Sequence, residues 1–157
     1  MQTICLYYQI HQPFRLRNIP FFEIGNGLDY FDEELNRTIL REVAHTTYLP
    51  MNRTLLKLIQ DNKGRFNISF CISGSALDQF EKYMPELIES FKELSDTGCV
   101  EFIGETYAHS LAGLKSRKEF TRQVQSHSTK INKLFGVKPK VFQFSEMSYT
   151  DALGEIL

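Results

Sequence analysis

The sequence contains no tryptophan, only three cysteines in 157 residues, and a formal net charge of −1 at pH 7. The cysteines stand apart at Cys5, Cys71 and Cys99, with no Cys-x-x-Cys pair. This spacing excludes a zinc ribbon, and the odd number argues against a complete disulfide framework. We expect buried free thiols, as in a reducing compartment. The near-neutral charge gives no bulk electrostatic reason to expect nucleic acid or an anionic membrane as a partner.

Long apolar runs and phosphate-binding motifs are also missing. No run approaches the roughly 20 residues that span a bilayer, and the N-terminus lacks the basic and apolar regions of a signal peptide. We therefore expect a cytoplasmic protein without membrane contact. The sequence has no Gly-rich phosphate loop and no Gly-x-Ser-x-Gly elbow, so nucleotide-binding and serine-hydrolase classes have no support, and we predict no cofactor.

Four segments rich in β-favouring residues alternate with amphipathic helices. The predicted strands are Thr3 to Ile10, Phe66 to Ile72, Cys99 to Ile103 and Lys140 to Phe144. The predicted helices are one capped by Asp32, one starting near Pro50, a stretch from Ser75 to Leu94 that Pro85 interrupts, one from Ser116 to Gly136, and first turns in Thr150 to Leu157. This alternation is typical of a parallel α/β sheet.

Three local patterns refine this prediction. The first strand is apolar or aromatic nearly throughout, so we expect both of its faces to be covered. Ser75 with Asp78, and Ser116 with Glu119, have the spacing of capping boxes. The connection from Phe14 to Tyr30 is too long for an ordinary βα turn, and loops of that length often act as lids or binding loops.

Polar side chains follow each predicted strand. In a parallel sheet the strand ends share one rim, where ligands bind and catalytic groups cluster. The residues at this rim are His11, Gln12, Ser73, Ser75, Glu105, Tyr107, His109, Glu146, Tyr149 and Asp151. Two glutamates, two histidines and two tyrosines among them fit a sugar or acyl site.

Structural interpretations stand beside this one. His11 could bind a backbone carbonyl, His109 could cap a loop, and Glu105 could pair with a basic neighbour. His127 has no rim position and lies near the apolar face of its helix, so we expect a structural role. His11, Glu105 and His109 match no zinc spacing, and we predict no metal site.

Three of these strand-end segments resemble signatures of glycoside hydrolase family 57. They are His11-Gln12-Pro13-Phe14, Gly104 to Leu111 and Phe142 to Tyr149, in the order and strand context of that family. The resemblance to its α-amylase and 4-α-glucanotransferase members implies the N-terminal part of a (β/α)7 barrel, a distorted TIM-like fold, with four parallel strands. It also implies retaining cleavage or transfer of α-glucosidic bonds in an α-glucan or oligosaccharide.

The resemblance assigns roles to six residues. Glu146 would be the nucleophile, because the third signature carries it. The substrate-binding residues would be His11, Gln12, Glu105, His109 and Tyr149. A retaining glycosidase also needs a carboxylic acid about 5–5.5 Å from its nucleophile.

This sequence departs from the family at two points. The family commonly has Phe-Arg-Asn-Thr-Glu where this chain has Phe142 to Glu146, so an Arg and an Asn are replaced. Its general acid is an aspartate in a fourth motif beyond residue 157, and Asp151 belongs to the third motif. We therefore expect residues 1–157 to be a partial catalytic barrel, truncated after the fourth strand. Such a chain would be inactive alone and would need the remaining barrel segment or self-association.

Two further functions remain open. The first is a non-enzymatic carbohydrate-binding or assembly module derived from that barrel. The second is a metal-dependent polysaccharide deacetylase, which also uses a seven-stranded α/β barrel. The deacetylase would need an Asp-Asp pair near the first strand and a later His-x-x-x-His-like pair, and neither is present.

Overall fold

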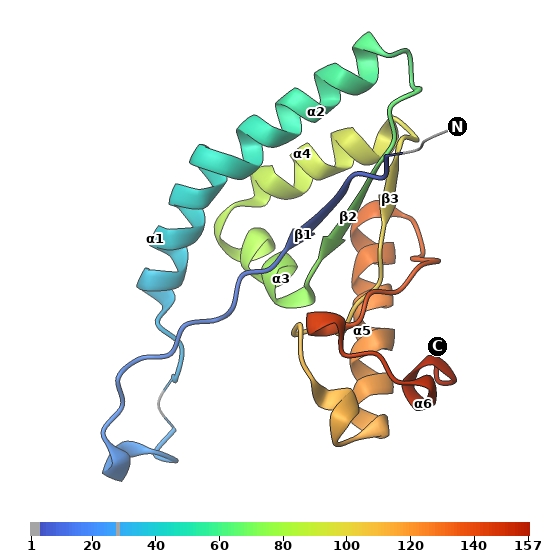
Figure 1. Cartoon of the computed structure of the whole chain (residues 1–157). Helices are drawn as coiled ribbons and strands as arrows, with labels where there is room; N and C mark the ends of the chain where they lie inside the picture. The colour runs from blue at the N-terminus through green and yellow to red at the C-terminus, as the bar shows by residue number, and fades with distance from the viewer. Residues whose placement is uncertain (1–3, 28) are drawn as a thin grey trace.

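A parallel three-stranded sheet organises the computed structural model, which describes residues 4–27 and 29–157. The strands are β1 (Tyr7–Ile10), β2 (Ile68–Ile72) and β3 (Val100–Phe102), in the order β1-β2-β3 (Figure 1). The register pairs Tyr8 with Phe70, and Phe70 with Phe102. The α/β class and the parallel order are as predicted. Thr3, the predicted first strand residue, lies outside the described residues.

Helices connect each strand to the next. They are α1 (Glu33–Val43), α2 (Leu49–Asp61), α3 (Gly74–Tyr83), α4 (Pro85–Asp96), α5 (Arg117–Phe135) and α6 (Asp151–Gly154). Figure 1 shows α1 and α2 as one long rod with α4 alongside α2. No helix in the described part of the chain is both long and apolar enough to cross a membrane.

The capping signals were only partly predictive. Asp32 caps α1 by accepting a hydrogen bond from the backbone N–H of Leu35, and Ser116 caps α5 as expected. The prediction for α3 was wrong by two residues, because Ser73 is its N-cap and accepts from the N–H of Ala76. Ser73 ends a strand in extended conformation, which is the backbone geometry that an N-cap requires.

Proline lies in the first turn of two helices. Pro85 starts α4 and separates it from α3, as predicted. The helix predicted to start near Pro50 is α2, which starts at Leu49 and has Pro50 in its first turn. A π-helical turn, Ala44–Tyr48, joins α1 to α2.

The core lies between the sheet and the helices, and a series of phenylalanine rings runs through its aliphatic side chains. The Phe70 ring on β2 meets the Phe91 ring of α4 edge-on, with centroids 5.3 Å apart. Phe91 in turn stacks on Phe80 of α3 at 6.2 Å. All three side chains are fully buried. These edge-on and stacked pairs bury large apolar area without tryptophan.

The opposite face of the sheet is polar and open. Along β1 the exposed residues Tyr7 and Gln9 alternate with the more buried Tyr8 and Ile10, so the prediction that both faces are covered was wrong. On the same face the Ser69 hydroxyl of β2 donates to the Glu101 carboxylate of β3 at 3.2 Å.

The three cysteines differ in exposure. Cys71 and Cys99 are buried, as predicted, whereas Cys5 is exposed just before β1. All three are free thiols. Cys5 lies two residues before β1, which is an edge strand of the described sheet.

The predicted fourth strand does not form in the described chain. Lys140 to Phe144 makes one parallel bridge, between Phe142 and Gly104, with two backbone hydrogen bonds of 2.8 Å. This segment has a sheet neighbour on one side only, and Val141 is 49% exposed. The Phe142 and Phe144 rings pack instead on Phe120 of α5. That contact holds the segment beside β3 without a continuous ladder.

A glycine at the start of α3 makes room for the loop after β3. A Cβ atom at Gly74 would lie 2.5 Å from the Tyr107 ring. We therefore expect Gly74→Ala to lower the free energy of unfolding by about 1–3 kcal/mol, the usual cost of overpacking. Urea denaturation measures this difference.

The matched control is the same substitution in a Tyr107→Ala background. Without the ring, alanine should be neutral or stabilising, because it is the better helix former by about 0.5–1 kcal/mol. An equal loss of stability in both backgrounds would contradict the steric explanation.

Candidate active site

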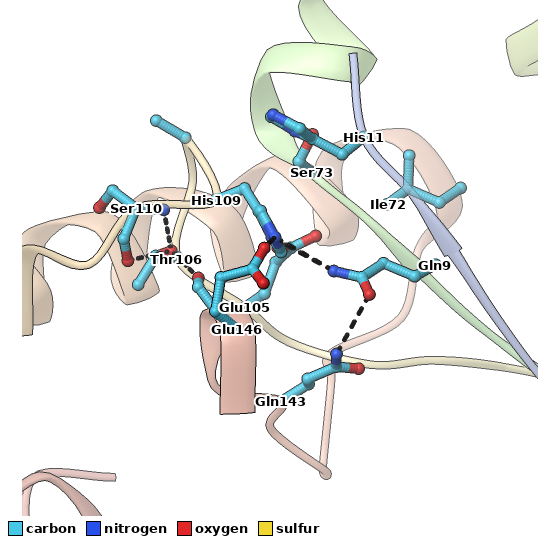
Figure 2. A network of polar contacts seen from close by, with 12 residues as sticks. Gln9, His11, Ile72, Ser73, Glu105, Thr106, His109, Ser110, Gln143 and Glu146 are labelled. Atoms are coloured by element: carbon cyan, nitrogen blue, oxygen red, sulfur yellow. Dashed lines mark hydrogen bonds and ion pairs between the residues drawn. The ribbon is translucent and has the colours of Figure 1, made fainter. Parts of the chain in front are cut away.

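Four of the predicted site residues gather at the carboxyl ends of the strands. His11 follows β1, and Glu105 and His109 follow β3. Glu146 lies in a short 3₁₀ turn, Ser145–Met147, after the segment that bridges to Gly104. Figure 2 shows the Glu105, His109 and Glu146 side chains directed toward one another.

Glu105 is the buried centre of this cluster. Its side chain is 1% exposed, and its Oε2 lies 2.6 Å from Nδ1 of His109. Its Oε1 has no hydrogen-bond partner in the described part of the chain. Burial, and then the charge of Glu105, raise the pKa of the neighbouring Cys71 thiol. The carboxylate therefore sits in surroundings that disfavour any second negative charge.

The His109 ring joins Glu105 to Glu146. Its Nε2 lies 3.4 Å from Oε1 of Glu146, whose side chain is 75% exposed. The Gln9 amide lies 3.2 Å from the same ring nitrogen, and Gln143 donates to Oε1 of Gln9 at 3.4 Å. The imidazole thus lies between a buried and an exposed carboxylate.

The backbone is left-handed at both residues of the His109–Glu146 contact. The φ angles of His109 and Glu146 are +51° and +52°, and that of Met147 is +55°. Such conformations are unfavourable for residues other than glycine, and they concentrate at functional sites. Thr106 holds the first turn, because its hydroxyl accepts from the N–H of Ser110 at 2.8 Å.

His11 stands beside His109 on the β1 side. Their ring centroids are 4.8 Å apart, and Nδ1 of His11 lies 2.8 Å from the Ser73 hydroxyl. Burial lowers the pKa of His11, and the charge of His109 lowers it further, against the opposite effect of Glu105 and Glu146. His11 is therefore favoured in its neutral form.

Two predicted site residues do not join the cluster. Gln12 is buried, donates to the Tyr48 hydroxyl at 3.0 Å and accepts from Arg15 at 3.3 Å. Tyr149 is 59% exposed, and its ring packs edge-on against Phe144. In residues 4–27 and 29–157, no group of three or more His, Cys, Asp or Glu side chains is placed to hold a metal ion.

The sequence model of Glycosyl hydrolase family 57 matches residues 5–157. The chain belongs to this family. It is 34% identical over 156 residues to a protein of Methanocaldococcus jannaschii described as "Putative alpha-amylase". That alignment takes in 98% of this chain and 33% of the relative, so the chain spans about a third of the relative's length.

Solved structures share the fold of this family 57 chain. The 4-α-glucanotransferase of Thermococcus litoralis superposes with a TM-score of 0.68 at 15% identity, covering 97% of this chain and 21% of that one. The α-amylase AmyC of Thermotoga maritima gives 0.66 at 16% identity, covering 98% and 37%. The peptidoglycan deacetylase PdaC of Bacillus subtilis gives 0.50 at 20% identity, covering 68% and 48%.

Sequence reasoning missed two residues of the family 57 rim. Gln9 contacts His109 from β1, and Gln143 contacts Gln9. Gln9 lies two positions before His11, so the two-residue period of a strand places both on one face. Gln143 was visible only as the glutamine in place of the family's arginine, and nothing in that exchange indicated its partner.

The expected structural role of His127 is confirmed. Its Nε2–H donates to the carbonyl of Ile72 at 2.8 Å, and its Nδ1 accepts from the N–H of Glu105 at 3.4 Å. Its side chain is fully buried. Burial lowers its pKa against the raising effects of the Ile72 hydrogen bond and of Glu105. A neutral imidazole thus hydrogen-bonds both the end of β2, at Ile72, and the backbone of Glu105.

The lowered pKa of His127 predicts a pH dependence of stability. Because the folded-state pKa lies below the ordinary 6.5, the unfolded chain binds the proton first as the pH falls. The stabilising contribution is therefore complete above about pH 6.5 and lost below it. We expect His127→Gln to reduce the acid-side slope of the unfolding free energy by up to about 1.4 kcal/mol per pH unit.

Urea denaturation between pH 7 and pH 5 measures this slope. His45→Gln is the matched control, because His45 is exposed on the π-helical turn, and it should leave the slope as in the unsubstituted chain. His11, whose pKa is also lowered, contributes with the same sign in all three proteins. An unchanged slope in His127→Gln would contradict the prediction.

Proposed function

We propose that this chain carries the nucleophile half of a retaining α-glucan-active site, within the N-terminal part of a (β/α)7 barrel. Membership of family 57 and the convergence of the rim residues support this proposal. The superposition on 97% of this chain but 21% of the Thermococcus litoralis enzyme supports the partial barrel. The substrate would be a starch-like or glycogen-like polymer or a maltooligosaccharide.

The accessibility of Glu146 is the observation that carries the proposal. Its carboxylate is 75% exposed at the strand ends and has His109 as its hydrogen-bond partner. An oxygen of Glu146 would attack the anomeric carbon, and the bond from that carbon to the leaving oxygen would break. Water or a sugar hydroxyl would then release the glycosyl group from the ester.

The imidazoles would hold the sugar during this step. His11 and His109 lie on the same rim, with ring centroids 4.8 Å apart. Ring N–H groups beside the nucleophile can donate to sugar hydroxyls and favour the ionised carboxylate. Gln12 contacts Tyr48 and Tyr149 contacts Phe144, so our proposal gives neither Gln12 nor Tyr149 a contact with the sugar.

The second carboxyl group would come from outside residues 1–157. Glu105 is buried and bound to His109, so it is not open to protonate a leaving oxygen. Asp151 is exposed at the start of α6, without a contact to Glu146 in the described chain. We propose that residues 1–157 alone do not cleave natural α-glucans and need the remaining barrel segment, in the same polypeptide or another.

A carbohydrate-binding or assembly module is the second candidate. The buried state of Glu105 favours it, because the rim then offers one open carboxylate rather than a catalytic pair. Such a module would bind the sugar at the imidazoles and form no covalent intermediate. The likeness to a peptidoglycan deacetylase concerns the fold alone and adds no activity to this choice.

A donor with a fluoride leaving group separates the two candidates. Fluoride departs without a protonated acid, so 5-fluoro-α-glucosyl fluoride should react with the chain as it stands. We expect a covalent glucosyl adduct on Glu146, mapped by peptide mass spectrometry, and none in Glu146→Gln. The matched control Glu155→Gln, an exposed residue of the same C-terminal segment, should label as the unsubstituted chain does.

Each outcome decides between the readings. An adduct that persists in Glu146→Gln would remove Glu146 as the nucleophile. Binding of maltoheptaose, measured by calorimetry, without any adduct would favour the module. If the chain neither binds maltoheptaose nor becomes labelled, the α-glucan proposal for this chain is overturned.

A further inference from the structure

Glu105 is a carboxylate buried with one partner. Its side chain is 1% exposed, and in the part of the chain that the structure describes only His109 lies at ion-pair distance, 2.6 Å from Oε2. Oε1 has no partner at all within the same residues. A buried carboxylate without a counter-charge is strongly destabilising. A proton must therefore be held between Glu105 and His109.

The far side of the His109 ring faces a second carboxylate. Nε2 lies 3.4 Å from Oε1 of Glu146. A bare ring nitrogen would direct its lone pair at this negative charge, whereas an N–H donates to it. The Gln9 side-chain amide near the same nitrogen can rotate to present either its oxygen or its NH₂ group to the ring. The Gln143 amide, which contacts Gln9, can rotate with it. The two carboxylates thus select a ring with a proton on each nitrogen.

We propose that Glu105 is a positioning residue that keeps His109 protonated at both nitrogens and directs its Nε2–H at Glu146. The catalytic consequence rests on the proposed function, in which Glu146 is the nucleophile. The protonation state of the ring does not depend on that function. Glu105 then acts through His109 and not by contact with the sugar, which differs from the direct binding role that the family resemblance implied.

The other titratable groups around His109 agree with this state. His11, from the end of β1, is favoured neutral because burial, and then His109, lower its pKa. His127, from α5, is neutral and hydrogen-bonds the backbone of Glu105. Cys71 and Tyr7, from β2 and β1, have pKa values raised by burial in the first place and also by Glu105, and so stay uncharged. The charge at the rim is therefore confined to Glu105, His109 and Glu146.

The catalytic value of this arrangement lies in the second N–H. A charge-assisted hydrogen bond fixes the direction of the Glu146 carboxylate before the sugar arrives. Glu105 anchors the donor from the buried side, where solvent does not screen it. The left-handed turn at His109 aims the ring from the end of β3 toward Glu146.

Nitrogen-15 spectra of the histidine rings in the full chain test the inference directly. At pH 7 we expect His109, identified by the signal lost in His109→Gln, to have two protonated nitrogens, and His127 to have one, Nε2. Glu105→Gln should remove one of the two protons from His109. The matched control Glu101→Gln, a carboxylate on the open sheet face, should leave both. A neutral His109 with a bare Nε2 in the unsubstituted chain would overturn the proposal, whether or not any variant folds.

The labelling reaction separates this inference from the function on which it rests. With 5-fluoro-α-glucosyl fluoride, Glu105→Gln should label the same residue, Glu146, about 10- to 100-fold more slowly, the range expected for one lost charge-assisted hydrogen bond. Glu101→Gln should label at the original rate. If the unsubstituted chain has a doubly protonated His109 but no adduct forms, the function fails and the positioning role stands. An unchanged labelling rate in Glu105→Gln would overturn the catalytic part of the inference.

Discussion

The hydrogen bond between Glu105 and His109 is the interaction on which the rim depends. It is short, 2.6 Å, almost wholly shielded from solvent, and formed within one loop. The loop is fixed to α5 because the Gln123 side chain accepts from the N–H of Ala108 and from the Ser110 hydroxyl. The His109 ring therefore has contacts to β1, through Gln9, and to the segment that carries Glu146, and its loop is bound to α5.

Much of the fold was predictable from local patterns. Three strands, the break at Pro85 and the end of α5 at Gly136, whose φ is +72°, follow from apolar periodicity, proline chemistry and glycine conformation. These signals are local, and each depends on a few neighbouring residues. The parallel order alone predicted a rim of polar residues at the strand ends. The family resemblance then selected His11, Glu105, His109 and Glu146 from that rim, together with Gln12 and Tyr149.

The errors have tertiary causes. Lys140 to Phe144 has the composition of a strand, but a ladder needs a neighbour, and the Phe142 and Phe144 rings find apolar contact on α5 instead. Ser75 has capping spacing, yet Ser73 takes the role because the strand delivers it in the extended conformation. Gln12 was predicted at the rim, but its buried side chain donates to the Tyr48 hydroxyl instead. Sequence spacing cannot encode which of two adjacent polar residues turns inward.

The polar face of the sheet constrains what can lie against it. Gln9, Ser69 and Glu101 present amide, hydroxyl and carboxylate groups there, and Ser69 and Glu101 are already joined by a hydrogen bond. An apolar surface packed against these groups would remove their water and leave them without hydrogen-bond partners. Any protein segment that closes over this face must therefore bring its own hydrogen-bonding groups or enclose ordered water. The space between this face and such a segment would then be hydrated rather than apolar.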